Sequence, residues 1–315
     1  MSAVVIAAAY GGPEVLSVID QPVPEPGPGE ARIQVRAAGV NPVDWKSYSG
    51  MFGTDPARLP LRIGSEAAGV VTAAGPGAAG PAGPVAPGDE VIAYRAPGAY
   101  AADLVVPGTA LVPKPATLDW AAAAGLLLTG VTAWHLLTVT DVQQGDTVLI
   151  HGGAGGVGVM AVQLAAARGA TVIATASPRR HDFLRELGAT PVSYGEGLAG
   201  RVRAVAPGGI NAALDLVGTE EALDVSLALL GNRARIATIA NFRHGAEAGI
   251  KVLGNGPGAD PGTEIRNAAR LELARLAGSG TVRVFVSETY PLREAAAAHE
   301  SIKSGHATGK IVLIP

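Results

Sequence analysis

The segment from Asp146 to Arg168 constrains the fold of this chain more than any other stretch. It opens with a short apolar run, Thr147–His151, that is typical of a buried strand, and it closes with helical apolar spacing over Val157–Arg168. Between the two, residues 153–158 read Gly-Ala-Gly-Gly-Val-Gly and match the G-x-G-x-x-G pattern. A strand, a glycine turn and a helix in this order bring bare backbone and unpaired N–H groups against a pyrophosphate. The segment therefore predicts a dinucleotide site.

The residues after the next predicted strand indicate which dinucleotide is bound. An NAD site usually places Asp or Glu about 20 residues beyond the glycines, where the carboxylate accepts hydrogen bonds from the ribose hydroxyls. No acidic residue lies between Thr171 and His181, and Ser177, Arg179 and Arg180 stand there instead. Arginine binds a 2′-phosphate through charge-assisted hydrogen bonds. We therefore expect NADPH rather than NADH; the alternative is that both arginines are solvated charges at the start of the next helix.

From Asp146 onward, predicted strands alternate with predicted helices. Strands are expected at Thr147–His151, Thr171–Ala176, Pro191–Ser193, Asn211–Asp215 and Arg235–Ile239. Helices are expected at Val157–Arg168, Arg179–Leu187, Leu198–Val205 and Glu220–Leu230. This alternation predicts an α/β fold with a doubly wound parallel sheet.

The sequence before the glycine motif predicts β-structure separated by proline- and glycine-rich turns. Strands are expected at Val4–Ala9, Val15–Asp20, Ala31–Ala38, Glu66–Ala73, Glu90–Tyr94 and Ala101–Val106. Short strands at this spacing indicate a partly open β-barrel. A helix over Leu118–Leu137 should then lead into the nucleotide domain. The final strand–helix–strand pattern, from Arg283 to Ile314, is expected to rejoin the barrel, which gives one domain from residues 1–121 and 271–315 and a second from residues 122–270.

Length and charge exclude several classes of protein. A chain of 315 residues exceeds the usual size of a single core, and a net charge of −3 provides no general field for nucleic acid. The apolar N-terminus lacks the basic region of a signal peptide, and the apolar run near Ala121–Leu128 is too short to span a bilayer. We expect a cytoplasmic protein with no membrane segment.

The chain contains no cysteine, which excludes disulfides, thiolate nucleophiles and thiolate zinc ligands. Its six histidines show no metal-ligand spacing, so no metal site is expected. His151 sits at the end of the strand before the glycine turn. It is interpreted as a half-buried histidine bonded to backbone rather than as a catalytic base, because the pyrophosphate should lie at that point.

Motifs spread over nearly the whole chain resemble the zinc-independent quinone oxidoreductase family of the medium-chain dehydrogenase/reductase superfamily. They occur in the family order at residues 10–16 (YGGPEVL), 37–44 (AAGVNPVD), 64–71 (GSEAAGVV), 88–91 (GDEV), 98–101 (GAYA), 128–134 (LTGVTAW) and 308–313 (TGKIVL). The resemblance implies a GroES-like substrate domain joined to a Rossmann domain, NADPH as the cofactor, and a homodimer.

The resemblance also implies roles for individual residues. The pyrophosphate loop is matched by Gly155, Gly156, Val157 and Gly158, and the 2′-phosphate site by Ser177 and Arg179, with Arg180 as a possible helper. Tyr194 matches a tyrosine near the adenosine half, and Thr129 matches a threonine near the nicotinamide. The strand ends that line the cofactor cleft are matched by Val217, Ile239, Ala240 and Asn241. Zinc-dependent relatives carry Cys near Val40-Asn41 and His at Ser65, so zinc-assisted alcohol oxidation is not expected here.

NADPH without a Lewis acid favours acceptors that need only modest activation, such as quinones and α,β-unsaturated carbonyls. The candidate donors to the developing oxyanion are Asn41, Lys46, Tyr48 and Tyr94, and we select Asn41 and Tyr48 as the candidate catalytic residues. The alternative role for Asn41 is that of a turn residue that caps local backbone. Asp44 is interpreted as a hydrogen-bond anchor, and solvent is the default proton source.

Two other functions fit the same sequence. One is a dedicated biosynthetic enoyl or enone reductase that acts on one large metabolite. The other is an NADPH-binding sensor or partner module with little turnover. Substrate pockets are expected on the loops Tyr48–Pro60 and Phe242–Asp260, which carry no readable motif, so the natural substrate is not predicted.

Overall fold

In the computed structural model, which describes residues 1–256, 258–305 and 307–315, the chain divides into two units. Unit 1 comprises residues 1–128 and 270–315, and unit 2 comprises residues 129–269. Pro257, in the predicted substrate loop, and His306 lie outside the described residues. Among the described residues, no helix is both long and apolar enough to cross a membrane.

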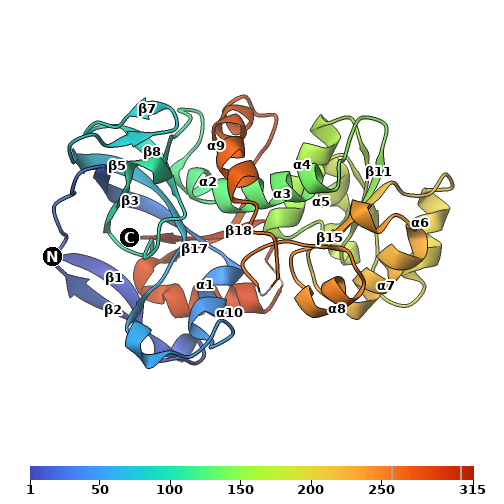
Figure 1. Ribbon diagram of the computed structural model, residues 1–315, viewed down its shortest axis with the longest axis horizontal. Coiled ribbons are helices and arrows are strands. Elements are labelled where there is room, and N and C mark those ends of the chain that lie inside the picture. The colour runs from blue at the N-terminus through green and yellow to red at the C-terminus, as the bar shows by residue number, and fades with distance from the viewer. Residues whose placement is uncertain (257, 306) are drawn as a thin grey trace. The chain divides into compact units, whose positions relative to one another are not determined.

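Unit 1 is built mainly from β-strands. They are β1 (Ser2–Ala7), β2 (Leu16–Gln21), β3 (Glu30–Val40), β4 (Leu61–Arg62), β5 (Glu66–Ala74), β6 (Ala79–Gly80), β7 (Gly83–Pro84), β8 (Glu90–Tyr94), β9 (Asp103–Pro107), β10 (Leu111–Pro113), β17 (Val286–Pro291) and β18 (Lys310–Ile314). One sheet has the order β2-β1-β4, and the larger has the order β10-β8-β5-β3-β18-β17, with β9 also paired to β3. In Figure 1 the red strand β18 lies beside the blue strand β3, and the two pair antiparallel with Val312 opposite Gly39. The last segment therefore rejoins the N-terminal sheet.

The inward face of β3 explains the core of unit 1. Alternate residues Ala31, Ile33 and Val35 are buried, while polar residues of the strand point outward. Buried side chains from β5, β8, β18 and the loop that contains Tyr100 complete this apolar cluster. The helices that lie entirely within unit 1 are α1 (Pro42–Tyr48), α2 (Trp120–Ala124) and α10 (Ala295–Lys303).

Unit 2 contains a six-stranded parallel sheet of order β13-β12-β11-β14-β15-β16. Its strands are β11 (Thr147–His151), β12 (Thr171–Thr175), β13 (Ala189–Val192), β14 (Ala212–Asp215), β15 (Ile236–Thr238) and β16 (Lys251–Val252). The helices that lie entirely within unit 2 are α4 (Gly156–Ala167), α5 (His181–Glu186), α6 (Leu198–Val205), α7 (Glu220–Leu229) and α8 (Phe242–Glu247). In sequence order this arrangement is 3-2-1-4-5-6, so the predicted doubly wound sheet is confirmed.

The structure corrects several element predictions. The helix expected over Leu118–Leu137 is two helices, α2 and α3 (Leu127–Val139), because α2 ends at Gly125, its C-cap residue. A Cβ at Gly125 would lie 3.0 Å from Lys310 Cγ, so a small residue suits this position. Helices α8 and α9 (Thr263–Gly278) and the two-residue strand β16 were not predicted. α9 contains both the last residues of unit 2 and the first residues of the returning part of unit 1.

Candidate active site

The glycine turn of unit 2 is fixed to the neighbouring strand. β11 ends at His151 and α4 begins at Gly156, with Gly155 as its N-cap residue. The N–H of Gly152 donates to Oγ1 of Thr175 at 3.0 Å, and the N–H of Gly153 donates to the carbonyl of Thr175 at 3.0 Å. The turn is therefore held at the carboxyl edge of the sheet, where doubly wound folds bind nucleotides.

The glycines of the turn differ in what the fold itself demands. A Cβ on Gly158 would lie 2.2 Å from the carbonyl oxygen of Gly152, so close packing of α4 against the turn requires glycine there. A Cβ on Gly155 would meet only the Gly152 carbonyl, at 3.6 Å, which is an ordinary contact. The fold does not need glycine at Gly155, whereas the close approach of a pyrophosphate to the backbone does. This difference is what a nucleotide-binding turn requires.

The residues predicted to bind a 2′-phosphate follow β12, the strand beside β11. Ser177 precedes a 3-10 turn, Pro178–Arg180, and its hydroxyl makes no capping bond to that turn. Arg179 is exposed, and Ser177 and Arg180 are half-buried. The structure thus brings Ser177 and Arg179 to the same sheet edge as the glycine turn, without an intervening carboxylate in residues 176–181. This charge pattern fits an anionic 2′-phosphate better than a neutral ribose hydroxyl.

The other strand ends of unit 2 are organised by Asp215. This buried carboxylate accepts from the N–H groups of Val217 and Gly218 at 3.0 and 2.9 Å, and from the hydroxyl of Thr238 at 2.7 Å. Oγ1 of Thr238 in turn accepts from the N–H groups of Ala240 and Asn241. The predicted cofactor-lining residues Val217, Ile239, Ala240 and Asn241 therefore lie on two loops that one carboxylate ties together.

The remaining predicted cofactor residues are placed very differently from one another. Tyr194 follows β13 and is 61 % exposed, so its ring is available for stacking. Thr129 lies in α3 and is only 4 % exposed.

The interpretation of His151 as bonded to backbone is wrong, because the ring is buried and Nε2 lies 3.0 Å from the hydroxyl of Ser226. Burial lowers the pKa of His151 to about 4, so the ring is neutral.

In unit 1, the predicted residue Asn41 belongs to a buried ionic cluster. Nζ of Lys310 lies 2.9 Å from Oε1 of Glu66 and 2.5 Å from Oδ1 of Asn41, and it also donates to the carbonyl of Val40. Nδ2 of Asn41 donates to Oε1 of Glu66 at 3.0 Å, and the second Glu66 oxygen accepts from the N–H of Leu128. The cluster therefore contains a fully buried ion pair whose polar atoms have partners.

A second buried network surrounds Asp44, on the first turn of α1. Oδ2 of Asp44 accepts from the N–H of Asn41 at 2.9 Å and from the hydroxyl of Tyr100 at 3.0 Å, while Oδ1 accepts from Ser65 at 2.5 Å. His299 continues the network, with Nε2 at 3.0 Å from the Tyr100 hydroxyl and Nδ1 at 2.6 Å from the Tyr48 hydroxyl. Burial raises the pKa of Asp44 to about 6, although Ser65 and the other hydrogen bonds oppose that rise.

These networks change the interpretation of the two candidate catalytic residues. Asn41 and Tyr48 are each 1 % exposed. Both N–H groups of Asn41 Nδ2 have acceptors within unit 1, at Gly39 and Glu66, and the Tyr48 hydroxyl faces His299. Direct donation from either residue to a substrate oxygen would break an existing bond, so this geometry favours a positioning role. Asn41 is the N-cap residue of α1, and its Nδ2 donates to the backbone carbonyl of Gly39, while Asp44 accepts from the N–H of Asn41. The alternative role of Asn41 as a turn residue bonded to local backbone therefore has support.

The partners that make these networks were not predicted from the sequence. Glu66, Lys310, Tyr100 and His299 were not singled out, although the first three lie in the motifs at residues 64–71, 98–101 and 308–313. Glu66 and Lys310 are 244 residues apart in sequence, and Tyr48 and His299 are 251 apart. For Glu66 and Lys310 the signal was a charged residue at the first position of an apolar strand, whereas no local pattern marked Tyr100 or His299.

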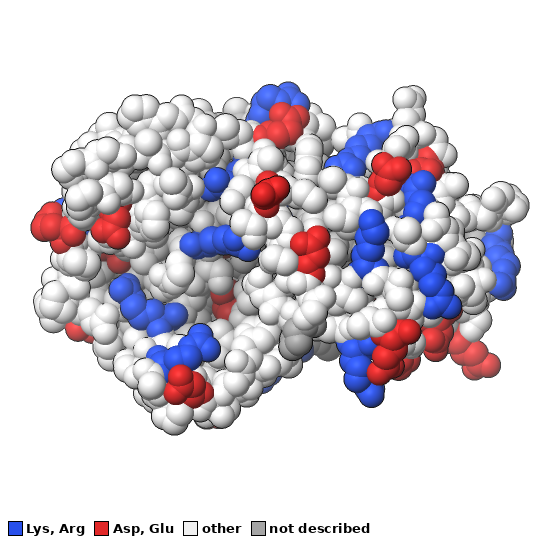
Figure 2. Space-filling model, in the orientation of Figure 1, with Lys and Arg blue, Asp and Glu red and all other residues white. Residues whose placement is uncertain are grey.

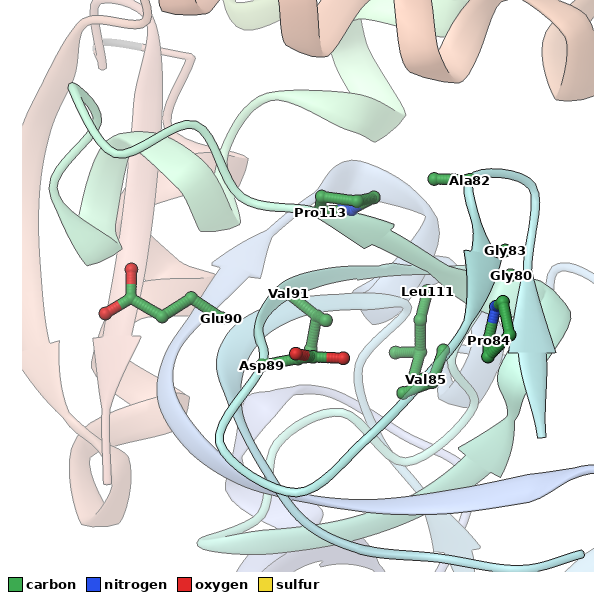
Figure 3. Close-up of a pocket in the computed structure, with 10 residues that line it drawn as sticks. All are labelled: Gly80, Ala82, Gly83, Pro84, Val85, Asp89, Glu90, Val91, Leu111 and Pro113. Atoms are coloured by element: carbon green, nitrogen blue, oxygen red, sulfur yellow. The ribbon is translucent and has the colours of Figure 1, made fainter.

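A pocket in unit 1 is formed by the turn between β6 and β7 and by the ends of β8 and β10 (Figure 3). It is lined by Leu111, Val85 and proline and glycine residues, and its carboxylates already have partners: Asp89 accepts from the N–H of Ala86, and Glu90 pairs with Lys114. Nothing in this lining suits an anionic cofactor.

On the face shown in Figure 2, cationic and anionic side chains are interspersed among the described residues, without a continuous basic stripe.

Comparison with known proteins relates both units to dehydrogenases. Residues 27–116 match the alcohol dehydrogenase GroES-like domain, and residues 187–313 match a family described as zinc-binding dehydrogenase. The described part of the chain nevertheless holds no group of three or more His, Cys, Asp or Glu side chains that could bind a metal ion. The GroES-like match confirms the class predicted for the β-rich domain.

Individual relatives are similar over almost the whole chain. A quinone oxidoreductase of Pseudomonas aeruginosa is 34 % identical over 98 % of both chains, and a 2-haloacrylate reductase of a Burkholderia species is 33 % identical over 97 % of this chain and 96 % of its own. The mycobacterial protein Rv1454c, solved in complex with NADPH, superposes with a TM-score of 0.87 at 34 % identity, over 99 % of this chain and 100 % of its own.

Proposed function

The chain belongs to the quinone oxidoreductase family of the medium-chain dehydrogenase/reductase superfamily, and on that premise we propose that it reduces quinones or α,β-unsaturated carbonyl compounds with NADPH. The observation that carries the proposal is the 34 % identity to a quinone oxidoreductase over 98 % of both chains. The similar 2-haloacrylate reductase supports a conjugated acceptor, because its named substrate carries a carbon–carbon double bond beside a carboxylate.

We propose that unit 2 holds the cofactor through its own loops. The backbone at Gly155, Gly156, Val157 and Gly158 would approach the pyrophosphate, for which the open space at Gly155 provides room. Ser177 and Arg179, assisted by Arg180, would bind the 2′-phosphate, and the exposed ring of Tyr194 would stack near the adenosine. The residues Thr129, Val217, Ile239, Ala240 and Asn241 would line the path toward the nicotinamide.

NADPH supplies a hydride and is oxidised to NADP⁺. The contribution of unit 1 is to hold a substrate and to manage the charge that develops on its oxygen. Asn41 and Tyr48 are proposed as positioning residues: Asn41 links the Glu66–Lys310 pair to α1, and Tyr48 holds His299 within the Asp44 network. A homodimer is proposed from the family resemblance, and its test is the mass in solution measured by light scattering.

The test of the proposed function is an acceptor screen with purified protein. NADPH oxidation should be rapid with 1,4-naphthoquinone and simple enones, and slow with saturated ketones and aldehydes, since these need stronger activation. NADH in place of NADPH should support much less turnover. Tight NADPH binding without turnover of any acceptor would instead identify a binding module, and turnover restricted to saturated carbonyls would contradict the proposal.

A further inference from the structure

The Asp44 network fixes which of its carboxyl oxygens can hold a proton. Oδ2 accepts two hydrogen bonds, from the N–H of Asn41 and the hydroxyl of Tyr100, so a proton on that oxygen would meet two donors. Among the described residues, Oδ1 has one partner, the hydroxyl of Ser65 at 2.5 Å. A hydroxyl both donates and accepts, so Ser65 tolerates either direction of this bond. Protonation of Asp44 therefore takes place at Oδ1, facing Ser65.

Tyr100 is held in its donor role by the next members of the network. Because the Tyr100 proton is directed to Asp44, its oxygen accepts from Nε2–H of His299, and Nδ1 of His299 then accepts from the Tyr48 hydroxyl. Burial, with Lys303 as a lesser cause, lowers the pKa of His299 to about 4, which keeps one proton on the ring and preserves this order. The chain of donors ends at Asp44 Oδ2.

Of the five side chains in this network, Ser65 is the most open to solvent. Asp44, Tyr48, Tyr100 and His299 are between 0 and 2 % exposed, whereas Ser65 is partly exposed. When Asp44 is ionised, the Ser65 proton points inward to Oδ1. When Asp44 is protonated, Oδ1–H donates to Ser65, and the Ser65 proton is free to point outward. The protonation state of the buried Asp44 carboxyl therefore determines whether the partly exposed Ser65 hydroxyl can donate its proton outward.

We propose that Asp44 stores the proton that completes the reduction of an α,β-unsaturated carbonyl, and that Ser65 delivers it to the α-carbon. This inference rests on the function proposed above. After hydride addition to the β-carbon, the substrate is an enolate that needs one proton. Ser65 breaks its O–H bond to form the new α-C–H bond, and Asp44 Oδ1–H passes its proton to Ser65 Oγ. The products are the saturated carbonyl and an Asp44 carboxylate, which water reprotonates through Ser65.

The charged and titratable groups around Asp44 allow its carboxyl group to hold a proton. The charge of Lys310 favours the ionised form of Asp44, but burial has the larger effect and raises the pKa of Asp44 to about 6. Glu66 faces Lys310 and neutralises it, and His299, Tyr48 and Tyr100 carry no charge near neutral pH. An acid of this strength can be reprotonated between turnovers. Quinone reduction makes a different demand, because a hydroquinone oxygen takes its proton directly from water.

The experiment reduces 2-methylcyclohexenone with wild type, Ser65→Ala and Ser65→Thr, and analyses the product at early times by chiral chromatography. Ser47→Ala is the matched control, since the Ser47 hydroxyl bonds the backbone carbonyl of Asp44 at 2.6 Å but does not touch its carboxyl. Wild type should give one enantiomer, and its turnover should fall as the pH rises above about 6. Ser65→Ala should give a racemic product, lose that pH dependence, and lower the ratio of enone to quinone turnover by about 100-fold. Ser65→Thr should restore the enantiomer.

Each outcome decides between the claims. Loss of stereochemical control in Ser65→Ala but not in Ser47→Ala supports the relay. A single enantiomer and an unchanged enone-to-quinone ratio in folded Ser65→Ala would overturn the relay and leave the proposed function intact. Equal loss in Ser47→Ala would also overturn it, because a structural effect would then explain both variants. Wild type that reduces neither enone nor quinone would overturn the proposed function and the relay with it.

Discussion

The buried pair of Glu66 and Lys310 makes a quantitative prediction about stability. Lys310 is 4 % exposed and Glu66 0 %, and the ammonium has three acceptors: Val40, Asn41 and Glu66. Lys310→Met removes the cation but leaves the carboxylate buried, where its remaining partners in the described part of the chain are the side-chain N–H of Asn41 and the backbone N–H of Leu128. Breaking a buried pair in this way costs about 3–5 kcal/mol. For a domain of this size the melting temperature should fall by roughly 6–20 °C.

A double-mutant cycle separates lost charge pairing from lost packing. Glu66→Gln alone should also destabilise unit 1, because Lys310 then keeps a buried charge without a counter-ion. The double variant, Glu66→Gln with Lys310→Met, removes both charges and should be more stable than the Lys310→Met variant. As a control, Glu272→Gln breaks an exposed pair with Arg275 on α9 and should leave the unfolding midpoint close to that of wild type.

The assay is urea unfolding followed by tryptophan fluorescence. The chain has three tryptophans, of which Trp134 lies in unit 2, so a Trp134→Phe background restricts the signal to Trp45 and Trp120 of unit 1. A cost below about 1 kcal/mol for Lys310→Met, in the range of an exposed pair, would refute the reasoning. Strictly additive costs in the double variant would show that the two charges do not interact as the geometry implies.

Three further predictions concern unit 2. Arg179→Ala should weaken NADPH binding by about 10- to 100-fold and leave NADH binding unchanged, measured by titration; equal losses would remove Arg179 from the 2′-phosphate site. Gly155→Ala should keep the melting temperature of wild type but weaken NADPH binding. Gly158→Ala should destabilise the fold itself, because the new Cβ would lie 2.2 Å from the Gly152 carbonyl oxygen. Full NADPH affinity in folded Gly155→Ala would show that the turn has a structural role and does not contact the pyrophosphate. Burial lowers the pKa of His151 from 6.5 to about 4, so the contribution of neutral His151 to stability is complete above pH 6.5 and declines by up to about 3 kcal/mol as the pH falls to 4. In urea unfolding, His151→Gln should therefore flatten the dependence of the unfolding free energy on pH. A pH dependence equal to that of wild type would contradict this prediction.

Local patterns predicted the sheet of unit 2 well. The strand Thr147–His151 and the helix Leu198–Val205 have the bounds that were expected. The errors have physical causes. α9 is rich in Arg and Glu, which interrupt its apolar stripe, although its Ala, Leu, Arg and Glu content strongly favours a helix. The Asn41–Asp44 turn is the start of a helix, which Pro42 at the first position and Asp44 at the third could have indicated.

The site was predictable only where its residues are close in sequence. The glycine turn and Ser177–Arg180 follow two neighbouring strands, so strand order alone places them at one edge of the sheet. The networks of unit 1 join residues that are hundreds of positions apart, and nothing in a local pattern pairs Lys310 with Glu66 or His299 with Tyr48. Asn41 was selected for its place in a motif, but its bonding partners, which decide its role, come from three separate strands.

The most direct test of the proposed reaction follows the transferred hydrogen itself. NADPH that carries deuterium at the transferable position is incubated with the protein and a simple enone, and the product is analysed by mass spectrometry and NMR. The proposed function predicts a saturated ketone with deuterium on the β-carbon, because the hydride adds to the electron-poor end of the conjugated system. An allylic alcohol with deuterium on the carbonyl carbon would contradict it and identify an alcohol dehydrogenase.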